Sequence, residues 1–83
     1  MTIQIASADE TIIETIAGAY SVHRDSSKII IIVDINQLTD KQELLLETDG
    51  LFVGFSFDDE MIKTKSQTMV FTDDRRLIVE LKL

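Results

Sequence analysis

The chain has 83 residues, a formal net charge of −7 and no cysteine. This length fits one domain, so we expect a single domain over residues 1–83. Without cysteine there is no disulfide, thiolate metal site or cysteine nucleophile. The negative charge argues against binding to nucleic acid or to anionic membranes, because both need a basic protein surface.

The cysteine count and the hydropathy pattern also bear on location. Small secreted domains usually carry disulfides, so their absence favours a reducing compartment. Residues 1–5 lack the basic and apolar regions of a signal peptide. The longest purely apolar run, residues 29–33, is far shorter than a membrane span. We therefore expect a cytoplasmic protein with no membrane partner.

The first third of the chain predicts a strand followed by a helix. Residues 2–6 alternate apolar and polar side chains, as a short strand does. Ser7 and Glu10 have the spacing of a capping box, which favours a helix over about residues 8–20. The apolar positions at helical spacing are Ile12, Ile13, Ile16, Ala17 and Tyr20. The many β-branched residues of this segment leave a strand as the alternative.

The next segment, residues 28–35, is apolar on both faces, which is typical of a central strand. Its position after the predicted strand and helix suggests a right-handed parallel crossover. A second helix is predicted near residues 40–49, with Thr39 or Asp40 as its cap and Gly50 as its terminator. The competing interpretation of residues 43–57 is a hairpin that turns at Asp49 and Gly50.

The remaining segments predict strands. Residues 51–57 alternate clearly, and another strand lies between Met61 and Thr72, strongest from Gln67 onward. A turn at residues 72–75 leads to a last strand over residues 77–83, so the last two strands form an antiparallel hairpin. We expect an α+β fold, with a mixed sheet of four or five strands and one or two helices mainly on one face. The alternative is an all-β roll or sandwich.

No catalytic or cofactor motif stands out. His23 is the only histidine and lies in a polar segment with Asp25, Ser26 and Ser27. A catalytic triad brings its members together from different elements, and no G-x-S-x-G nucleophile elbow is present. We therefore predict no catalytic residue, no cofactor and no metal site.

Two acidic clusters fall at predicted strand ends. Carboxylates from two loops could hold a divalent cation, but their spacing is not that of an EF-hand. They could also be exposed turn residues, or a surface that attracts a basic partner. The predicted partner-binding residues are Asp58, Asp59, Glu60, Asp73 and Asp74.

The strand residues that point away from the predicted core form a second sheet face. This face has a polar rim and an apolar centre, which is the pattern of a protein–protein interface. The predicted self-association residues are Ile30, Ile32, Phe52 and Ile78. A two-fold homodimer would cover them; the alternative is that the second helix or a loop buries them.

These observations favour a small, acidic, non-catalytic protein-interaction domain of the inhibitor, immunity or adaptor type. Its partner is expected to be a protein, and a basic one if charge selects it. The first alternative is a self-associating structural or assembly subunit. The second is a small enzyme dependent on a divalent metal ion.

Overall fold

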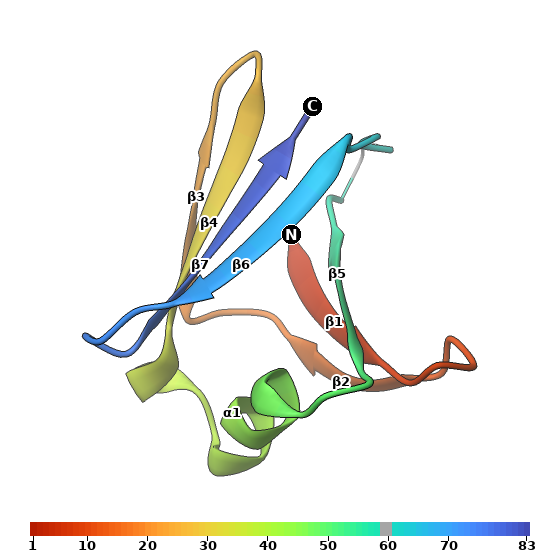
Figure 1. The fold of residues 1–83 in the computed structure, drawn as a ribbon, viewed down its shortest axis with the longest axis vertical. Helices are drawn as coiled ribbons and strands as arrows, with labels where there is room; N and C mark the ends of the chain where they lie inside the picture. Colours follow the sequence, from red (N-terminus) through yellow and green to blue (C-terminus); the bar gives the residue numbers. More distant parts are fainter. Residues whose placement is uncertain (59–60) are drawn as a thin grey trace. The chain divides into compact units, whose positions relative to one another are not determined.

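The computed structural model describes residues 1–58 and 61–83, which form seven strands, one short 3₁₀ helix and one α-helix (Figure 1). The strands are β1 (Thr2–Ala6), β2 (Ile12–Ile16), β3 (Tyr20–Arg24), β4 (Lys28–Asp34), β5 (Phe52–Ser56), β6 (Ser66–Phe71) and β7 (Arg76–Lys82). The helices are η1 (Ile35–Gln37) and α1 (Asp40–Glu47), which follow β4 and precede β5.

The chain divides into two compact units, each built from two separate segments. The first unit, residues 1–18 and 38–60, contains a three-stranded sheet in the order β2-β1-β5 together with α1. The second unit, residues 19–37 and 61–83, contains a four-stranded sheet in the order β3-β4-β7-β6. That residues 1–83 fold as one domain stays a prediction.

The sequence prediction of one mixed sheet is wrong in the number of sheets and in strand direction. Every strand pair of both sheets is antiparallel. The two strands that were expected to be joined by a parallel crossover, β1 and β4, belong to different sheets. Seven strands with a single α-helix agree with an α+β fold in the coarser sense.

The prediction of a helix over residues 8–20 is also wrong, because β2 and the start of β3 occupy this segment. Ser7 and Asp9 act in a hairpin turn between β1 and β2 instead of capping a helix. The Ser7 amide donates to the Thr11 carbonyl at 2.9 Å, and the Glu10 amide donates to the Ser7 carbonyl at 3.0 Å. Asp9 accepts hydrogen bonds from the Thr11 amide at 3.1 Å and from the Ser7 hydroxyl.

The physical reason is that the same short polar side chains satisfy amides in turns and at helix starts. The β-branched side chains of Ile12 and Ile16 then decide the outcome, since they fit a strand better than a helix. A residue with left-handed backbone lies on each side of β2. Glu10, before the strand, and Ala19, after it, both have φ 68°. A helix cannot continue through a residue in this conformation.

The second predicted helix is confirmed. The Thr39 hydroxyl accepts from the Gln42 amide at 3.1 Å, and the Gln42 side chain accepts from the Thr39 amide at 3.0 Å. This reciprocal pair starts α1 at Asp40. Gly50, with φ 85°, lies in the turn that leads to β5. The competing hairpin over residues 43–57 is therefore excluded.

The remaining strand predictions are confirmed, and β4 and β7 supply most of the buried apolar side chains of the four-stranded sheet. Alternate residues of each strand are buried, and each stands opposite a buried residue of the other strand. The opposed pairs are Ile29 with Leu81, Ile31 with Val79, and Val33 with Leu77. In the three-stranded sheet, the buried strand residues are Ile3, Ile5 and Ile16.

This alternation predicts a large difference in stability between two neighbouring substitutions. Ile31→Ala removes a fully buried side chain and is expected to lower the free energy of unfolding by about 2–5 kcal/mol. Ile30→Ala lies on the half-buried face of the same strand and is expected to cost about 1 kcal/mol. Urea denaturation followed by circular dichroism measures both. Equal losses would contradict the assignment of the two faces of β4.

Candidate functional site

The outer face of the three-stranded sheet carries an exposed apolar row that crosses all three strands. In the strand register, Ala6 of β1 stands opposite Ile12 of β2 on one side and Phe52 of β5 on the other. Ile12 is 52% exposed and Phe52 is 62% exposed. Since an exposed phenylalanine and isoleucine lie in one row, this face offers a contiguous apolar contact surface.

A shallow cavity of about 430 Å³ opens beside this row. Its walls are the row itself, the side chain of Gln4 and the hairpin turn at Ser7, Ala8 and Glu10. The cavity therefore combines an apolar floor with a carboxylate at its edge. It can accept a side chain that has an apolar stem and a polar or cationic head.

This row was not among the predicted surfaces, because Ile12 was expected to lie on a helix. A register shift between Ile5 and Ala6 brings Ile12 opposite Ala6, so Ile13 is the additional residue of a bulge. No pattern in the sequence marks that bulge. The sequence did indicate one member of the row. The alternation of residues 51–57 predicts that Phe52 points outward, and the structure confirms this orientation.

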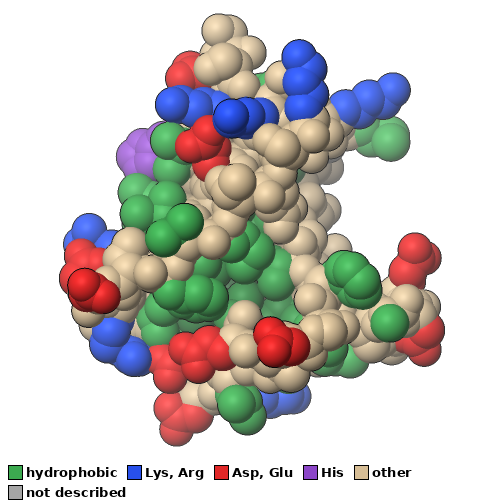
Figure 2. Space-filling view, viewed as in Figure 1, with side chains coloured by type: hydrophobic (Ala, Val, Ile, Leu, Met, Phe, Trp, Pro, Cys, Tyr) green, Lys and Arg blue, Asp and Glu red, His purple; other side chains and the backbone are tan. Residues whose placement is uncertain are grey.

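The net charge of the chain is concentrated on the unit that holds this row. Residues 1–18 and 38–60 contain ten aspartates and glutamates and one lysine, which gives a formal charge of −9. Residues 19–37 and 61–83 contain seven lysines and arginines and five acidic residues, which gives +2. Acidic and apolar side chains both reach the molecular surface (Figure 2). The acidity is thus a property of one unit.

Three of the four residues predicted for self-association share one sheet face. Ile30, Ile32 and Ile78 do lie together on the outer, half-buried face of β4 and β7. Phe52 lies on β5 in the other sheet, so it does not belong to the same sheet face. On the four-stranded sheet the apolar row is completed by Val70 of β6, which stands opposite Ile78 and is 57% exposed.

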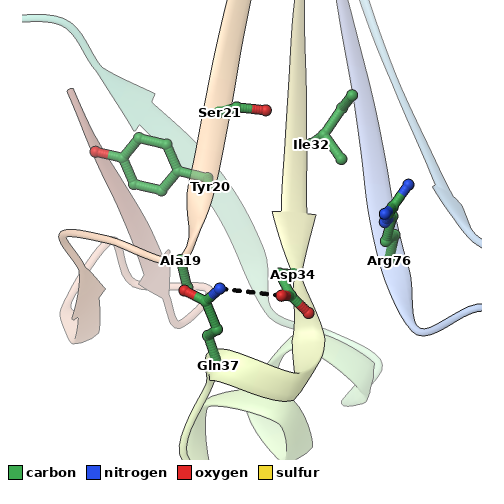
Figure 3. Close-up of a pocket in the computed structure, with 7 residues that line it drawn as sticks. All are labelled: Ala19, Tyr20, Ser21, Ile32, Asp34, Gln37 and Arg76. Atoms are coloured by element: carbon green, nitrogen blue, oxygen red, sulfur yellow. Dashed lines mark hydrogen bonds between the residues drawn. The ribbon is translucent and has the colours of Figure 1, made fainter.

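A polar cavity lies at one end of the outer face of the four-stranded sheet (Figure 3). Asp34 accepts hydrogen bonds there from the Gln37 side chain at 3.0 Å and from the Asn36 amide at 3.1 Å. Arg76 stands opposite Asp34 in the strand register, and Ser21 and Ile32 complete the wall. The Asp34 carboxylate is therefore fixed by hydrogen bonds from the residues that directly follow it in the chain.

The predicted acidic residues do not form one described cluster. Asp58 follows β5 in the first unit, where one carboxylate oxygen lies 3.4 Å from the N-terminal nitrogen of Met1. Asp73 and Asp74 form the turn between β6 and β7 in the second unit. Asp59 and Glu60 lie outside the described residues. The partner-binding role of these residues therefore stays a prediction.

His23 lies on β3 and is exposed. Its Nε2 atom is 3.4 Å from the Ser21 hydroxyl, two residues earlier on the same face of the strand.

Among residues 1–58 and 61–83, no group of three or more His, Asp or Glu side chains is arranged to hold a metal ion. No helix in the same part of the chain has the length and apolar character needed to cross a membrane. Comparisons with known protein families, with curated proteins and with solved structures find no match to this chain.

Three turn aspartates have a lowered pKa because hydrogen-bond donors stabilise their charged form. The Ser7 hydroxyl and then Thr11 lower the pKa of Asp9. The amide and then the hydroxyl of Ser27 lower the pKa of Asp25. The Thr72 hydroxyl lowers the pKa of Asp74, and the charge of Arg76 adds to it.

These shifts predict how stability depends on pH. Because the folded-state pKa lies below the unfolded one, the stabilising contribution is present above the ordinary aspartate pKa of about 4 and is lost as pH falls through the folded value. The free energy of unfolding should therefore decrease on acidification from about pH 6 to about pH 3. In Asp25→Asn this decrease should be smaller. Carboxyl NMR titration that gave these three groups an ordinary pKa would contradict the turn geometry.

Proposed function

We propose that this chain is a non-catalytic protein-interaction domain that binds a basic partner through its three-stranded unit. The observation that carries the proposal is the coincidence of two properties on that unit. It holds a formal charge of −9 and it exposes the apolar row of Ile12, Ala6 and Phe52. An apolar centre with a charged surround is the composition of a protein-binding surface.

Charge and apolar contact have different parts in this proposal. The negative potential of the unit attracts a basic partner from a distance and raises its association rate. The exposed ring of Phe52 and the side chain of Ile12 supply the apolar area that slows dissociation once contact is made. A lysine or arginine side chain suits both, because its aliphatic stem can lie on the apolar row while its cation faces Glu10.

The contrast between the two units supports the choice of surface. The four-stranded unit has a formal charge of +2, so a basic partner gains no long-range attraction from it. Its cavity beside Ser27 is lined by three lysines and one carboxylate, so its net charge is positive and would repel a cation; these residues are Lys28, Lys65, Lys82 and Glu80. The basic partner is therefore assigned to the first unit alone.

The charge part is tested by two matched reversals among the acidic residues predicted from the sequence. Asp58→Lys in the acidic unit is expected to weaken binding of a fluorescent peptide of alternating lysine and leucine by about three- to tenfold, through slower association. Asp73→Lys makes the same charge change in the other unit and is expected to have a much smaller effect. Fluorescence anisotropy at several salt concentrations measures both. Affinity that is independent of salt and of both substitutions would refute the electrostatic argument.

The apolar part is tested separately. Phe52→Ala is expected to weaken binding of the same peptide by about tenfold, mainly through faster dissociation. Leu44→Ala is the matched control, because Leu44 is 65% exposed in the same unit but lies on α1, outside the row. Equal effects of the two variants would show that the row of Ile12, Ala6 and Phe52 is not the contact surface.

A further inference from the structure

The cavity beside Ser27, with a volume of about 360 Å³, gathers positive charge on the four-stranded unit. Lys28 begins β4, Lys82 ends β7, and Lys65 directly precedes β6. These are three of the eight lysines and arginines of the chain, and with Glu80 they give the cavity lining a formal charge of +2. Figure 2 shows several lysine and arginine side chains close together along the upper edge of the view. The cavity is therefore a basic site on an acidic chain.

Two of these lysines stand directly opposite each other, Lys28 on β4 and Lys82 on β7. The Leu83 amide donates to the Ser27 carbonyl at 2.9 Å, so the adjoining residue pair of this ladder is hydrogen-bonded. Bonded and non-bonded pairs alternate along an antiparallel ladder, and the side chains are closer in the non-bonded pairs. Lys28 and Lys82 form such a non-bonded pair, where like charges destabilise a sheet. An anion bound between the two strands would relieve this repulsion.

The third lysine is held beside this pair, because the Lys65 amide donates to the Lys82 carbonyl at 2.6 Å. The carboxylate of Asp25, in the turn before β4, is occupied by other donors. It accepts from the Ser27 amide at 2.7 Å, from the Ser27 hydroxyl at 2.8 Å and from the Lys28 amide at 3.0 Å. Within residues 1–58 and 61–83, none of the three lysine amines forms an ion pair with a carboxylate. Their charge is thus available to an anion from outside the chain.

The charge and the amine type of the cavity favour a phosphate group over a carboxylate. A phosphate monoester carries a charge of about −1.5 to −2 at neutral pH and has three strong acceptor oxygens. This matches the formal charge of +2 and the three amines. Planar, bidentate recognition of a carboxylate is the task of arginine, whereas lysine binds phosphate as a point charge. The volume lies near the lower end of the range for ligand sites, about 300–1,000 Å³, so a small molecule fits best.

Glu80 adds a second requirement to the ligand. It lies two residues before Lys82 on β7, and therefore on the same face of that strand. Its carboxylate repels a bare phosphate ion, but it can accept a hydrogen bond from a hydroxyl group. We propose that this cavity binds a small phosphate monoester that carries a free hydroxyl group. The phosphate contacts the three lysine amines, and the hydroxyl donates to Glu80.

Calorimetric titration of the intact chain with glycerol 3-phosphate tests the site, at fixed ionic strength and in a buffer without phosphate. Lys28→Gln and Lys82→Gln should each raise the dissociation constant by about tenfold, because each removes one charge-assisted contact. Lys63→Gln is the matched control, since it makes the same charge change two residues before Lys65 but outside the cavity lining. Equal losses in all three variants would overturn the proposal, as would an original chain that does not bind at millimolar concentrations.

Glu80→Gln distinguishes a phosphate ester from free phosphate. Inorganic phosphate should bind this variant more tightly than it binds the original chain, because a repulsive charge is gone. Glycerol 3-phosphate should gain less, since its hydroxyl loses a charged acceptor. The original chain should bind glycerol 3-phosphate more tightly than inorganic phosphate. The reverse order of affinity would overturn the assignment of a hydroxylated ester.

Thermal unfolding checks the lysine pair by a second measurement. In chloride buffer, Lys82→Gln should raise the melting temperature by a few degrees, because the repulsion between Lys28 and Lys82 is removed. Glycerol 3-phosphate should raise the melting temperature of the original chain and have a much smaller effect on the variant. A variant that melts at a lower temperature than the original chain in chloride, or that gains as much from the ligand, contradicts the proposal.

This site is independent of the proposed function, because the basic peptide is assigned to the three-stranded unit. Lys82→Gln should therefore bind the peptide of alternating lysine and leucine as tightly as the original chain does. A chain that binds the peptide but not glycerol 3-phosphate overturns only the phosphate site. A chain that binds glycerol 3-phosphate but not the peptide overturns only the basic-partner function.

Discussion

The four-stranded sheet depends on the antiparallel ladder between β4 and β7. Seven consecutive residue pairs join these strands, and their buried members are all isoleucine, leucine or valine. Because side chains alternate between the faces of a strand, a single register slip would expose every one of them to water. The neighbouring strands β3 and β6 are attached to this central pair and can vary more freely. This explains why both outer strands are mostly exposed while alternate residues of the central pair are buried.

Neither sheet has a charged or polar residue in its buried set. Charged groups are therefore free to serve solubility and recognition, and they are distributed very unevenly. Ten of the fifteen acidic residues of the chain belong to the unit of residues 1–18 and 38–60. The net charge of the chain is the sum of the charges of two unlike units, one strongly acidic and one weakly basic. A charged partner therefore meets two different surfaces, and the net charge of the chain describes neither.

Much of the strand content could be predicted from the sequence. Alternation predicted β1, β5 and β7, an apolar run on both faces predicted β4, and the polar residues Thr39 and Asp40 predicted the start of α1. The segment of residues 8–20 was misread because Ser7, Asp9 and Glu10 fit a helix start and a hairpin turn equally well. Only pairing with β1, a contact that local sequence does not encode, distinguishes the two.

The division into two sheets could not be predicted for a similar reason. A strand's own residues show which positions face inward, but they do not show which strand is its neighbour. Ile30, Ile32, Ile78 and Phe52 were therefore correctly given an outward orientation and incorrectly given a common sheet. The apolar row on β1, β2 and β5 depends on the bulge at Ile13, which no residue pattern in the sequence predicts.

The order in which the strands are synthesised has a consequence for folding. Strand β7 comes last among the seven, yet it lies between β4 and β6 in the four-stranded sheet. Until the ribosome has made β7, β4 can pair only with β3, and β6 has no strand to pair with. The nascent chain therefore presents unpaired isoleucines of β4 until β7 emerges, which makes this interval the one in which chaperone protection or premature aggregation matters most.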